Sequence, residues 1–142
     1  NRVYANRCRK LSEQLGLAPR IRFWGEIADT DLMKLMAEAH LLCMPFAYEG
    51  FGITTAEAMR WGVPTMGSTS GATRELIDHG ENGLLFAPGN IPGVAAALSQ
   101  LAVDRKRLHA MGRSAFERAQ SQPSWQASMG QVEAFARRMA QH

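Results

Sequence analysis

The apolar residues of this chain follow two spacings, one typical of amphipathic helices and one typical of short buried strands. Helical spacing opens the chain between Tyr4 and Leu15, and Gly16 then offers a residue suited to the left-handed conformation that ends a helix. Thr30 and Asp104 are placed to cap two later helices. The spacing predicts helices at about 4–15, 32–39, 54–61, 74–78, 94–101, 108–115 and 125–139.

Short apolar or β-branched runs predict four strands, at 21–24, 41–44, 63–66 and 84–86. Because strand and helix alternate with short connections, we expect an α/β fold: a doubly wound, Rossmann-like parallel sheet with helices on both faces. Four strands are few for this class, and Asn1 lies inside a helical pattern. We therefore expect at least one further strand–helix unit upstream. The predicted parts are an N-terminally incomplete domain at 1–121 and a C-terminal helix at 122–142.

The loop that joins the second predicted strand to the next helix has the composition of a binding site. Ligands of open α/β sheets bind where parallel strands end and helices begin, and glycines in this loop let a ligand approach the backbone. The first N–H groups of the following helix lack helical partners and carry the positive end of its dipole, which suits a phosphate. We expect the side chain of Phe51 to lie in the core. The predicted site contains Gly50, Phe51, Gly52, Ile53 and Thr54.

Two carboxylates flank this loop, with seven residues between Glu49 and Glu57. Each has an ordinary structural interpretation. Thr54 and Glu57 have the spacing of a capping box, in which the glutamate accepts a hydrogen bond from the N–H of the capping residue. Glu49 could be a solvated loop side chain. Spacing alone favours the capping interpretation for Glu57.

The arrangement resembles the E-x7-E motif of the retaining glycosyltransferases of family 4, which have the two-domain GT-B fold. The similarity extends over about residues 20–125, in the order typical of that family. The matching segments are 21–25, Glu49-Gly50-Phe51-Gly52 with Glu57-Ala58-Met59, Gly62-Val63-Pro64, Gly71 with Glu75, Asn82-Gly83-Leu84-Leu85 and Pro123-Ser124-Trp125. The chain departs from the family at His40, Phe46 and Ala72, where Asp, Ser and Gly are common. Phe46 leaves the preference for a donor sugar open.

The resemblance implies that this chain is the donor-binding half of such an enzyme, inactive by itself. By that resemblance Glu49 is the catalytic residue and contacts the donor sugar, while Glu57 accepts hydrogen bonds from the ribose. Gly25 and Ile27 lie where the family places the nucleobase. The donor would be a UDP- or GDP-linked sugar, and the acceptor would bind a missing N-terminal domain. Transfer would retain the anomeric configuration and need no metal or other cofactor.

Two other functions stay open beside a transferase that builds a polysaccharide, glycolipid or other glycoconjugate. One is a non-catalytic module that binds nucleotide sugars without turnover. The other is an epimerase or phosphorylase of GT-B architecture, against which the spacing of Glu49 and Glu57 argues. An assay of transfer with a restored N-terminal half would distinguish these functions.

Composition narrows the classes of partner. Apolar residues make up 46% of the chain and charged residues 20%, as in a globular domain. The net charge of +3 comes from scattered residues, so we expect no nucleic-acid partner, with weak attraction to anionic lipid as an alternative. No apolar run reaches the ~18–20 residues of a membrane helix, and no signal peptide opens the chain. We expect a cytoplasmic protein, with peripheral association at the inner face of the membrane as the alternative.

Histidine and cysteine positions indicate no metal site. His40, His79, His109 and His142 lack the spacing of metal ligands, and neither cysteine has a close partner in the sequence. Cys43 lies in an apolar run, so we expect a buried core residue in a reducing compartment.

The last predicted helix has one apolar stripe formed by Trp125, Met129, Val132, Phe135 and Met139. In GT-B enzymes resembling this chain, the terminal helix crosses to the N-terminal domain. We therefore expect Trp125 to pack on this domain, and Phe135 and Met139 to be exposed or covered by another molecule.

Overall fold

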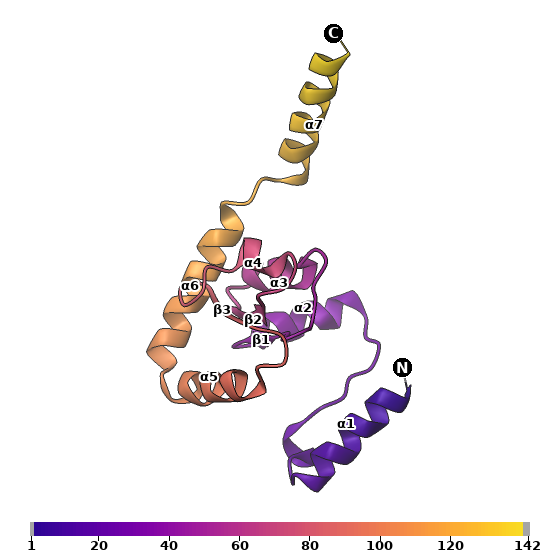
Figure 1. Ribbon diagram of the computed structural model, residues 1–142, viewed down its shortest axis with the longest axis vertical. Coiled ribbons are helices and arrows are strands. Elements are labelled where there is room, and N and C mark those ends of the chain that lie inside the picture. The colour runs from indigo at the N-terminus through magenta and orange to yellow at the C-terminus, as the bar shows by residue number, and fades with distance from the viewer. Residues whose placement is uncertain (1, 141–142) are drawn as a thin grey trace. The chain divides into compact units, whose positions relative to one another are not determined.

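The computed structural model describes residues 2–140, apart from the side chain of Trp125. The chain divides into two compact units, with the boundary between Met33 and Lys34. The larger unit, from Lys34 onward, contains the sheet and the loop predicted to bind a ligand. Figure 1 labels the helices and strands of both units.

The smaller unit begins with α1 (Arg2–Gln14), which ends as predicted before Gly16, a residue with a φ of 67°. One turn of 3-10 helix, η1 (Ala18–Arg20), follows. The next helix, α2 (Asp29–Glu38), begins before the predicted cap Thr30, which lies in its first turn. Acidic residues in that turn stabilise the helix, because their negative charge interacts favourably with the positive end of the helix dipole.

The predicted strand at 21–24 does not form. The segment has no regular secondary structure, and no strand in the described part of the chain pairs with it. An extended segment becomes a strand only when a neighbour satisfies its N–H and C=O groups. Its aromatic residues contact cations instead: Arg9 lies 5.1 Å from the ring centroid of Phe23, and Arg22 lies 5.8 Å from that of Trp24.

The larger unit is built on a parallel three-stranded sheet in the order β1–β2–β3. The edge strand β1 (Leu42–Cys43) pairs with β2 (Thr65–Ser68), which pairs in turn with β3 (Gly83–Phe86). All residues of β2 are buried, as expected for a central parallel strand covered on both faces. Three of the four predicted strands form, and the predicted α/β class with a parallel sheet is confirmed.

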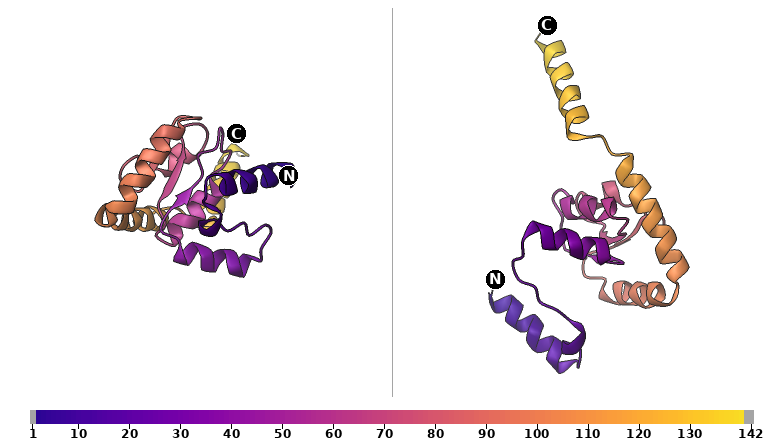
Figure 2. Two further views of the ribbon diagram at one scale, coloured as in Figure 1. Left: turned by 90° about the horizontal axis from the view of Figure 1, so that it is seen from below. Right: turned by 180° about the vertical axis from the view of Figure 1, so that it is seen from behind.

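Helices cover both faces of this sheet, as the views in Figures 1 and 2 show. One face packs against α5 (Ile91–Val103) and α6 (Arg105–Gln120). The other packs against α2 and α3 (Ile53–Arg60), while the short α4 (Thr73–Leu76) follows β2. Methionine fills much of the core, with buried side chains at Met36, Met59, Met66 and Met111.

Cys43 is not the buried core residue that the sequence predicts. It is exposed, because β1 has only one neighbouring strand and its outer edge is uncovered in the described chain. Nearby atoms still desolvate the sulfur enough to raise the pKa of the Cys43 thiol.

Two helices of the C-terminal region begin at side-chain caps. The carboxylate of Asp104 accepts from the N–H of Arg107 at 2.9 Å and starts α6, as predicted. The hydroxyl of Ser124 accepts from the N–H of Ala127 at 3.1 Å and starts α7 (Trp125–Met139).

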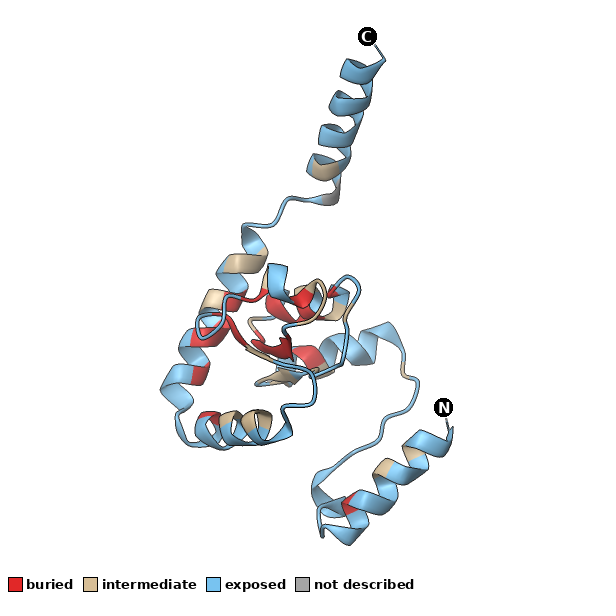
Figure 3. Cartoon of the chain, in the orientation of Figure 1, coloured by how far each residue is buried: buried red, intermediate tan, exposed pale blue. Residues whose placement is uncertain are grey.

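The apolar stripe of α7 is largely exposed, as Figure 3 shows by colour. Phe135 is 58% exposed and Met139 is 61% exposed, so the prediction for these two residues is confirmed. The predicted packing of Trp125 falls outside the described side chains. The domain boundary near residue 121 and the crossing role of α7 stay predictions.

Candidate functional site

The loop after β1 leaves the carboxyl end of that strand and enters α3, as the sequence predicts (Figure 1). Gly52 is the N-cap residue of α3 and has a φ of 69°. A β-carbon at Gly52 would lie 2.9 Å from Cδ1 of Leu76. The left-handed backbone and the nearby leucine both favour glycine at this position.

The carboxylate of Glu49 closes the loop on itself. Its Oε1 accepts from the N–H of Phe51 at 3.3 Å and from the N–H of Gly52 at 3.1 Å. These are two of the backbone donors that the sequence assigns to a phosphate. The half-buried Glu49 therefore shapes the loop as well as flanking it.

The first turn of α3 keeps backbone donors for a ligand. Within helix α3 the first recorded bond to the N-cap carbonyl runs from Ala56 N–H to Gly52, at 2.9 Å. Among residues 2–140, no acceptor is recorded for the N–H groups of Ile53, Thr54 or Thr55. Because these groups carry the positive end of the helix dipole, an anion is favoured there.

The backbone of Glu49 is fastened to the loop that follows β2. Glu49 and Gly71 form a parallel β-bridge, and the N–H of Ala72 donates to the Glu49 carbonyl at 2.8 Å. Gly71 has a φ of 88°, and a β-carbon on it would overlap that carbonyl. The position thus excludes other residues, whereas Ala72 contributes only its N–H. The sequence comparison with the family singled out Gly71 but not this contact.

Glu57 does not form the predicted capping box. The helix begins one residue earlier than predicted, with Gly52 as the N-cap, so Thr54 lies inside the first turn and cannot cap it. The side chain of Glu57 is exposed, and no hydrogen bond or ion pair is recorded for it in the described residues. Its carboxylate is therefore available to a ligand.

Large apolar side chains surround the loop. Phe51 is 83% exposed, so the expectation that it lies in the core is wrong. Its N–H donates to the Glu49 carboxylate within the loop, and the ring belongs to none of the core clusters of the described residues. Phe46, Tyr48 and Ile53 are also exposed. Gly50 is exposed too.

Gly25 and Ile27 belong to the smaller unit. Gly25 has a φ of 68°, and Ile27 is half-buried. Their place beside a bound nucleobase stays a prediction.

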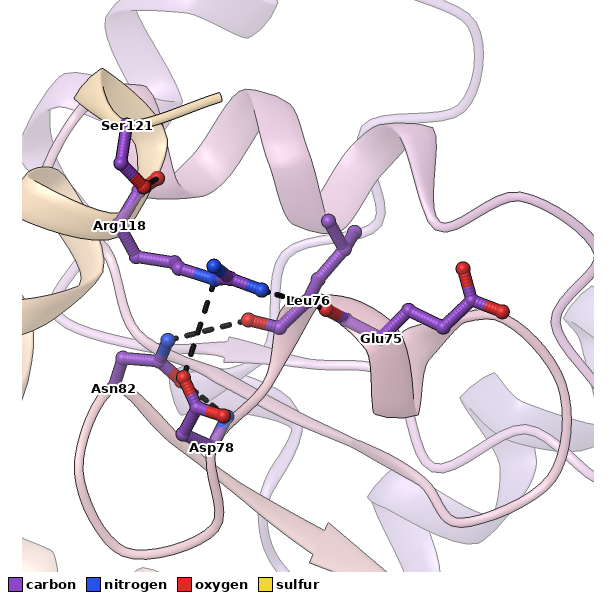
Figure 4. A network of polar contacts seen from close by, with 6 residues as sticks. All are labelled: Glu75, Leu76, Asp78, Asn82, Arg118 and Ser121. Atoms are coloured by element: carbon purple, nitrogen blue, oxygen red, sulfur yellow. Dashed lines mark hydrogen bonds and ion pairs between the residues drawn. The ribbon is translucent and has the colours of Figure 1, made fainter. Parts of the chain in front are cut away.

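A polar network fixes the turn between α4 and β3, and Figure 4 shows its side chains. The buried Asn82 accepts from the N–H of Asp78 at 2.9 Å and donates to the carbonyl of Leu76 at 3.2 Å. Arg118 of α6 donates to the carbonyl of Glu75 at 2.9 Å and lies 3.9 Å from the Asp78 carboxylate. The Asn82-Gly83 pair signals this turn in the sequence, but nothing local indicates the role of Arg118.

The described residues contain no group of three His, Cys, Asp or Glu side chains arranged to hold a metal ion. None of the helices in residues 2–140 is long and apolar enough to cross a bilayer.

Comparison with known proteins identifies relatives over most of the chain. Residues 2–118 match the family described as glycosyl transferases group 1. The chain is 32% identical over 124 residues to the MMP alpha-(1->4)-mannosyltransferase of Mycolicibacterium hassiacum, covering 87% of this chain and 30% of that protein. It is 31% identical over 141 residues to the GDP-mannose-dependent alpha-(1-6)-phosphatidylinositol monomannoside mannosyltransferase of Mycobacterium tuberculosis, covering 94% and 37%. The chain thus spans about a third of the length of these relatives.

Solved structures agree with this match. Sucrose-phosphate synthase from Thermosynechococcus elongatus superposes with a TM-score of 0.83 at 28% identity, covering 95% of this chain and 34% of that one. Anabaena Alr3699/HepE in complex with UDP also has a TM-score of 0.83 at 28% identity, covering 95% and 37%.

Proposed function

Because this chain belongs to the glycosyl transferases of group 1, we propose that it is the donor-binding part of a retaining enzyme. The longer enzyme transfers a sugar from a nucleoside-diphosphate sugar to an acceptor. One observation carries this proposal: the backbone donors at the start of α3 lie free beside the glycine loop and between two carboxylates.

The diphosphate binds at the first turn of α3. The N–H groups of Ile53, Thr54 and Thr55 offer preorganised donors where negative charge develops as the donor bond breaks. Gly50 is exposed, and a β-carbon on it would meet no atom within 4 Å, so the loop beside this turn leaves room for the diphosphate. The UDP complex of the similar Anabaena protein and the GDP-mannose dependence in the name of the mycobacterial relative support this assignment.

The two glutamates hold different parts of the donor. Glu49 uses Oε1 to hold the loop, and no bond is recorded for its Oε2 within the described chain, so that oxygen accepts from the sugar hydroxyls. Glu57 carries an exposed carboxylate on the same helix as the diphosphate donors, and it accepts from the ribose hydroxyls. Gly25 and Ile27 border the nucleobase. These contacts position the donor for transfer.

The acceptor binds an N-terminal domain of the longer protein, and transfer proceeds with retention and without a metal ion. We place the enzyme in the cytoplasm, with peripheral association at the inner face of the membrane as an alternative. The name of the phosphatidylinositol monomannoside mannosyltransferase includes a lipid, which supports that alternative.

Amide chemical-shift mapping with UDP and with GDP tests donor binding. We expect the largest shifts at residues 51–55, with smaller ones near residues 25–27. If the amide signals at the start of α3 did not change on addition of either nucleotide, the proposed site would be wrong. Restoring the N-terminal half and assaying transfer then separates an enzyme from a non-catalytic binding module, and the anomeric configuration of the product tests retention.

A further inference from the structure

A cavity of about 700 Å³ lies at the amino-terminal ends of the strands, opposite to the donor loop. His40 and Pro64 line it. His40 lies two residues before the start of β1, and Pro64 directly precedes β2. The donor loop instead follows the carboxyl end of β1. In a parallel sheet all strands begin at one side of the domain and end at the opposite side. The cavity is therefore separate from the donor site. Its volume is typical of pockets that bind small organic ligands.

Two glycines bring α3 and α6 together at this cavity. Gly62 ends α3 with a φ of 68°, and a β-carbon on Gly112 of α6 would lie 2.6 Å from the Gly62 carbonyl oxygen. The helices therefore meet backbone to backbone. Larger side chains on either side of the contact, including Trp61 and Phe116, form part of the lining.

The polar lining contains two arginines and two histidines. It includes Arg105, Arg113, His40 and His109, with Glu117 as the one acidic residue. Neither arginine has a recorded ion pair or side-chain hydrogen bond within residues 2–140, and both are exposed. Arginine side chains that face a cavity without an acidic partner favour an anionic ligand.

Arg118 lies on the same helix as Arg105 and Arg113 but has partners within the fold. It donates to the carbonyl of Glu75 and approaches the carboxylate of Asp78 (Figure 4), so its role within the fold is evident. Arg105 and Arg113 have no comparable partner in the described chain, and packing of the fold does not account for them.

Two large aromatic side chains border the cations. Trp61 is 49% exposed and Phe116 is 45% exposed, although both line the cavity. Aromatic faces beside arginines suit a ligand that has an organic body as well as a charge, because the rings cover its C–H surface. Inorganic phosphate alone would leave these rings uncovered.

We propose that this cavity is a second ligand site, which binds a phosphomonoester carried on a polyol or glycerol group. Arg105 and Arg113 bind the phosphate, and Trp61 and Phe116 pack against the organic part. The phosphomonoester can belong to a soluble sugar phosphate or to a lipid headgroup. The site is separate from the donor loop. Its test therefore does not depend on whether the function proposed above is correct.

Binding to the full chain tests the proposal with two probes. The soluble probe is glucose 6-phosphate, with glucose as its uncharged control. The lipid probe is a phosphatidylcholine vesicle containing phosphatidic acid, with a phosphatidylcholine vesicle as its control. Saturable binding of the first probe identifies a soluble ligand, and binding of the second alone identifies a lipid headgroup. Binding of neither overturns the proposal.

Matched double variants separate the cavity from general charge. Arg105→Gln with Arg113→Gln should weaken binding at least ~10-fold, because two charge-assisted hydrogen bonds to phosphate are lost. Lys106→Gln with Arg107→Gln removes the same charge from the same helix outside the cavity lining, and should leave binding nearly unchanged. Equal weakening by the two pairs would overturn the proposal. All four side chains are exposed, so the variants should fold.

Two further readouts locate the ligand. Trp61 fluorescence should change on binding, and Trp61→Phe should abolish that change while calorimetry still detects the ligand. Saturating UDP should leave the affinity for glucose 6-phosphate unchanged. Competition between UDP and the sugar phosphate would place the latter at the donor loop and contradict a second site.

Discussion

The backbone of Glu49 lies directly against Gly71, and the two residues form a parallel β-bridge between the loops that follow β1 and β2. The N–H of Ala72 donates to the same Glu49 carbonyl. The side chain of Glu49 meanwhile accepts from Phe51 and Gly52. One residue thus joins two loops at the carboxyl edge of the sheet and sets the start of α3.

Replacing Gly71 by alanine should destabilise the protein and displace Glu49. The left-handed backbone costs an L-residue about 1–2 kcal/mol, and the new methyl group would also collide with the Glu49 carbonyl. Gly80→Ala is the matched control, because Gly80 has a φ of 91° and a β-carbon on it would meet no atom within 4 Å. Thermal unfolding and UDP calorimetry should show a stability loss in both variants but weaker UDP binding only for Gly71→Ala.

The two glutamates should respond differently to loss of charge. Glu57→Gln should leave the unfolding free energy nearly unchanged, because no capping box depends on it, and should weaken UDP or GDP binding. Glu49→Gln should keep the loop, since the amide oxygen can still accept from Phe51 and Gly52, and should spare bare nucleotide binding. It should weaken UDP-glucose or GDP-mannose binding by about tenfold, as expected for one lost bond to a charged group. Equal losses for nucleotide and nucleotide sugar at Glu49 would contradict the assigned roles.

Asn82 should be important for stability although it lies in a turn. Asn82→Ala removes a buried side chain and both of its hydrogen bonds, to the Asp78 N–H and to the Leu76 carbonyl, which costs about 1–3 kcal/mol of unfolding free energy. Glu81→Ala, at an exposed position in the same turn, should change stability by less than about 0.5 kcal/mol. Similar denaturation midpoints for the two variants would show that the network in Figure 4 does not hold the turn.

The exposed stripe of α7 should contribute little to the stability of this chain. Phe135→Ser with Met139→Ser should lower the unfolding free energy by less than about 0.5 kcal/mol, because both side chains are exposed. Met111→Ala, at a buried position of α6, should cost about 2–5 kcal/mol. Urea unfolding of the variants checks this contrast. A large loss from the α7 pair would indicate that the stripe is covered within the chain.

Features that depend on local pattern could be predicted from the sequence. The α/β class, the end of α1 before Gly16, the cap at Asp104 and the loop between β1 and α3 all follow from spacing within a few residues. The family could be identified for the same reason, because its motif is a set of residues at short, fixed intervals in one segment. The periodicity of side chains and the chemistry of caps act over one or two turns, so neighbouring residues suffice to specify them.

Features that depend on distant partners were decided only by the tertiary structure. Residues 21–24 have strand-like composition but lack a neighbour to complete a ladder, and Cys43 is exposed because its strand is at the edge of the described sheet. The contact of Glu49 with Gly71, the polar partners of Arg118 and the cavity beside Gly112 join segments well separated in the sequence. Whether a polar group finds its partner, or an apolar group its cover, depends on which segments the fold brings together, and no local pattern contains that information.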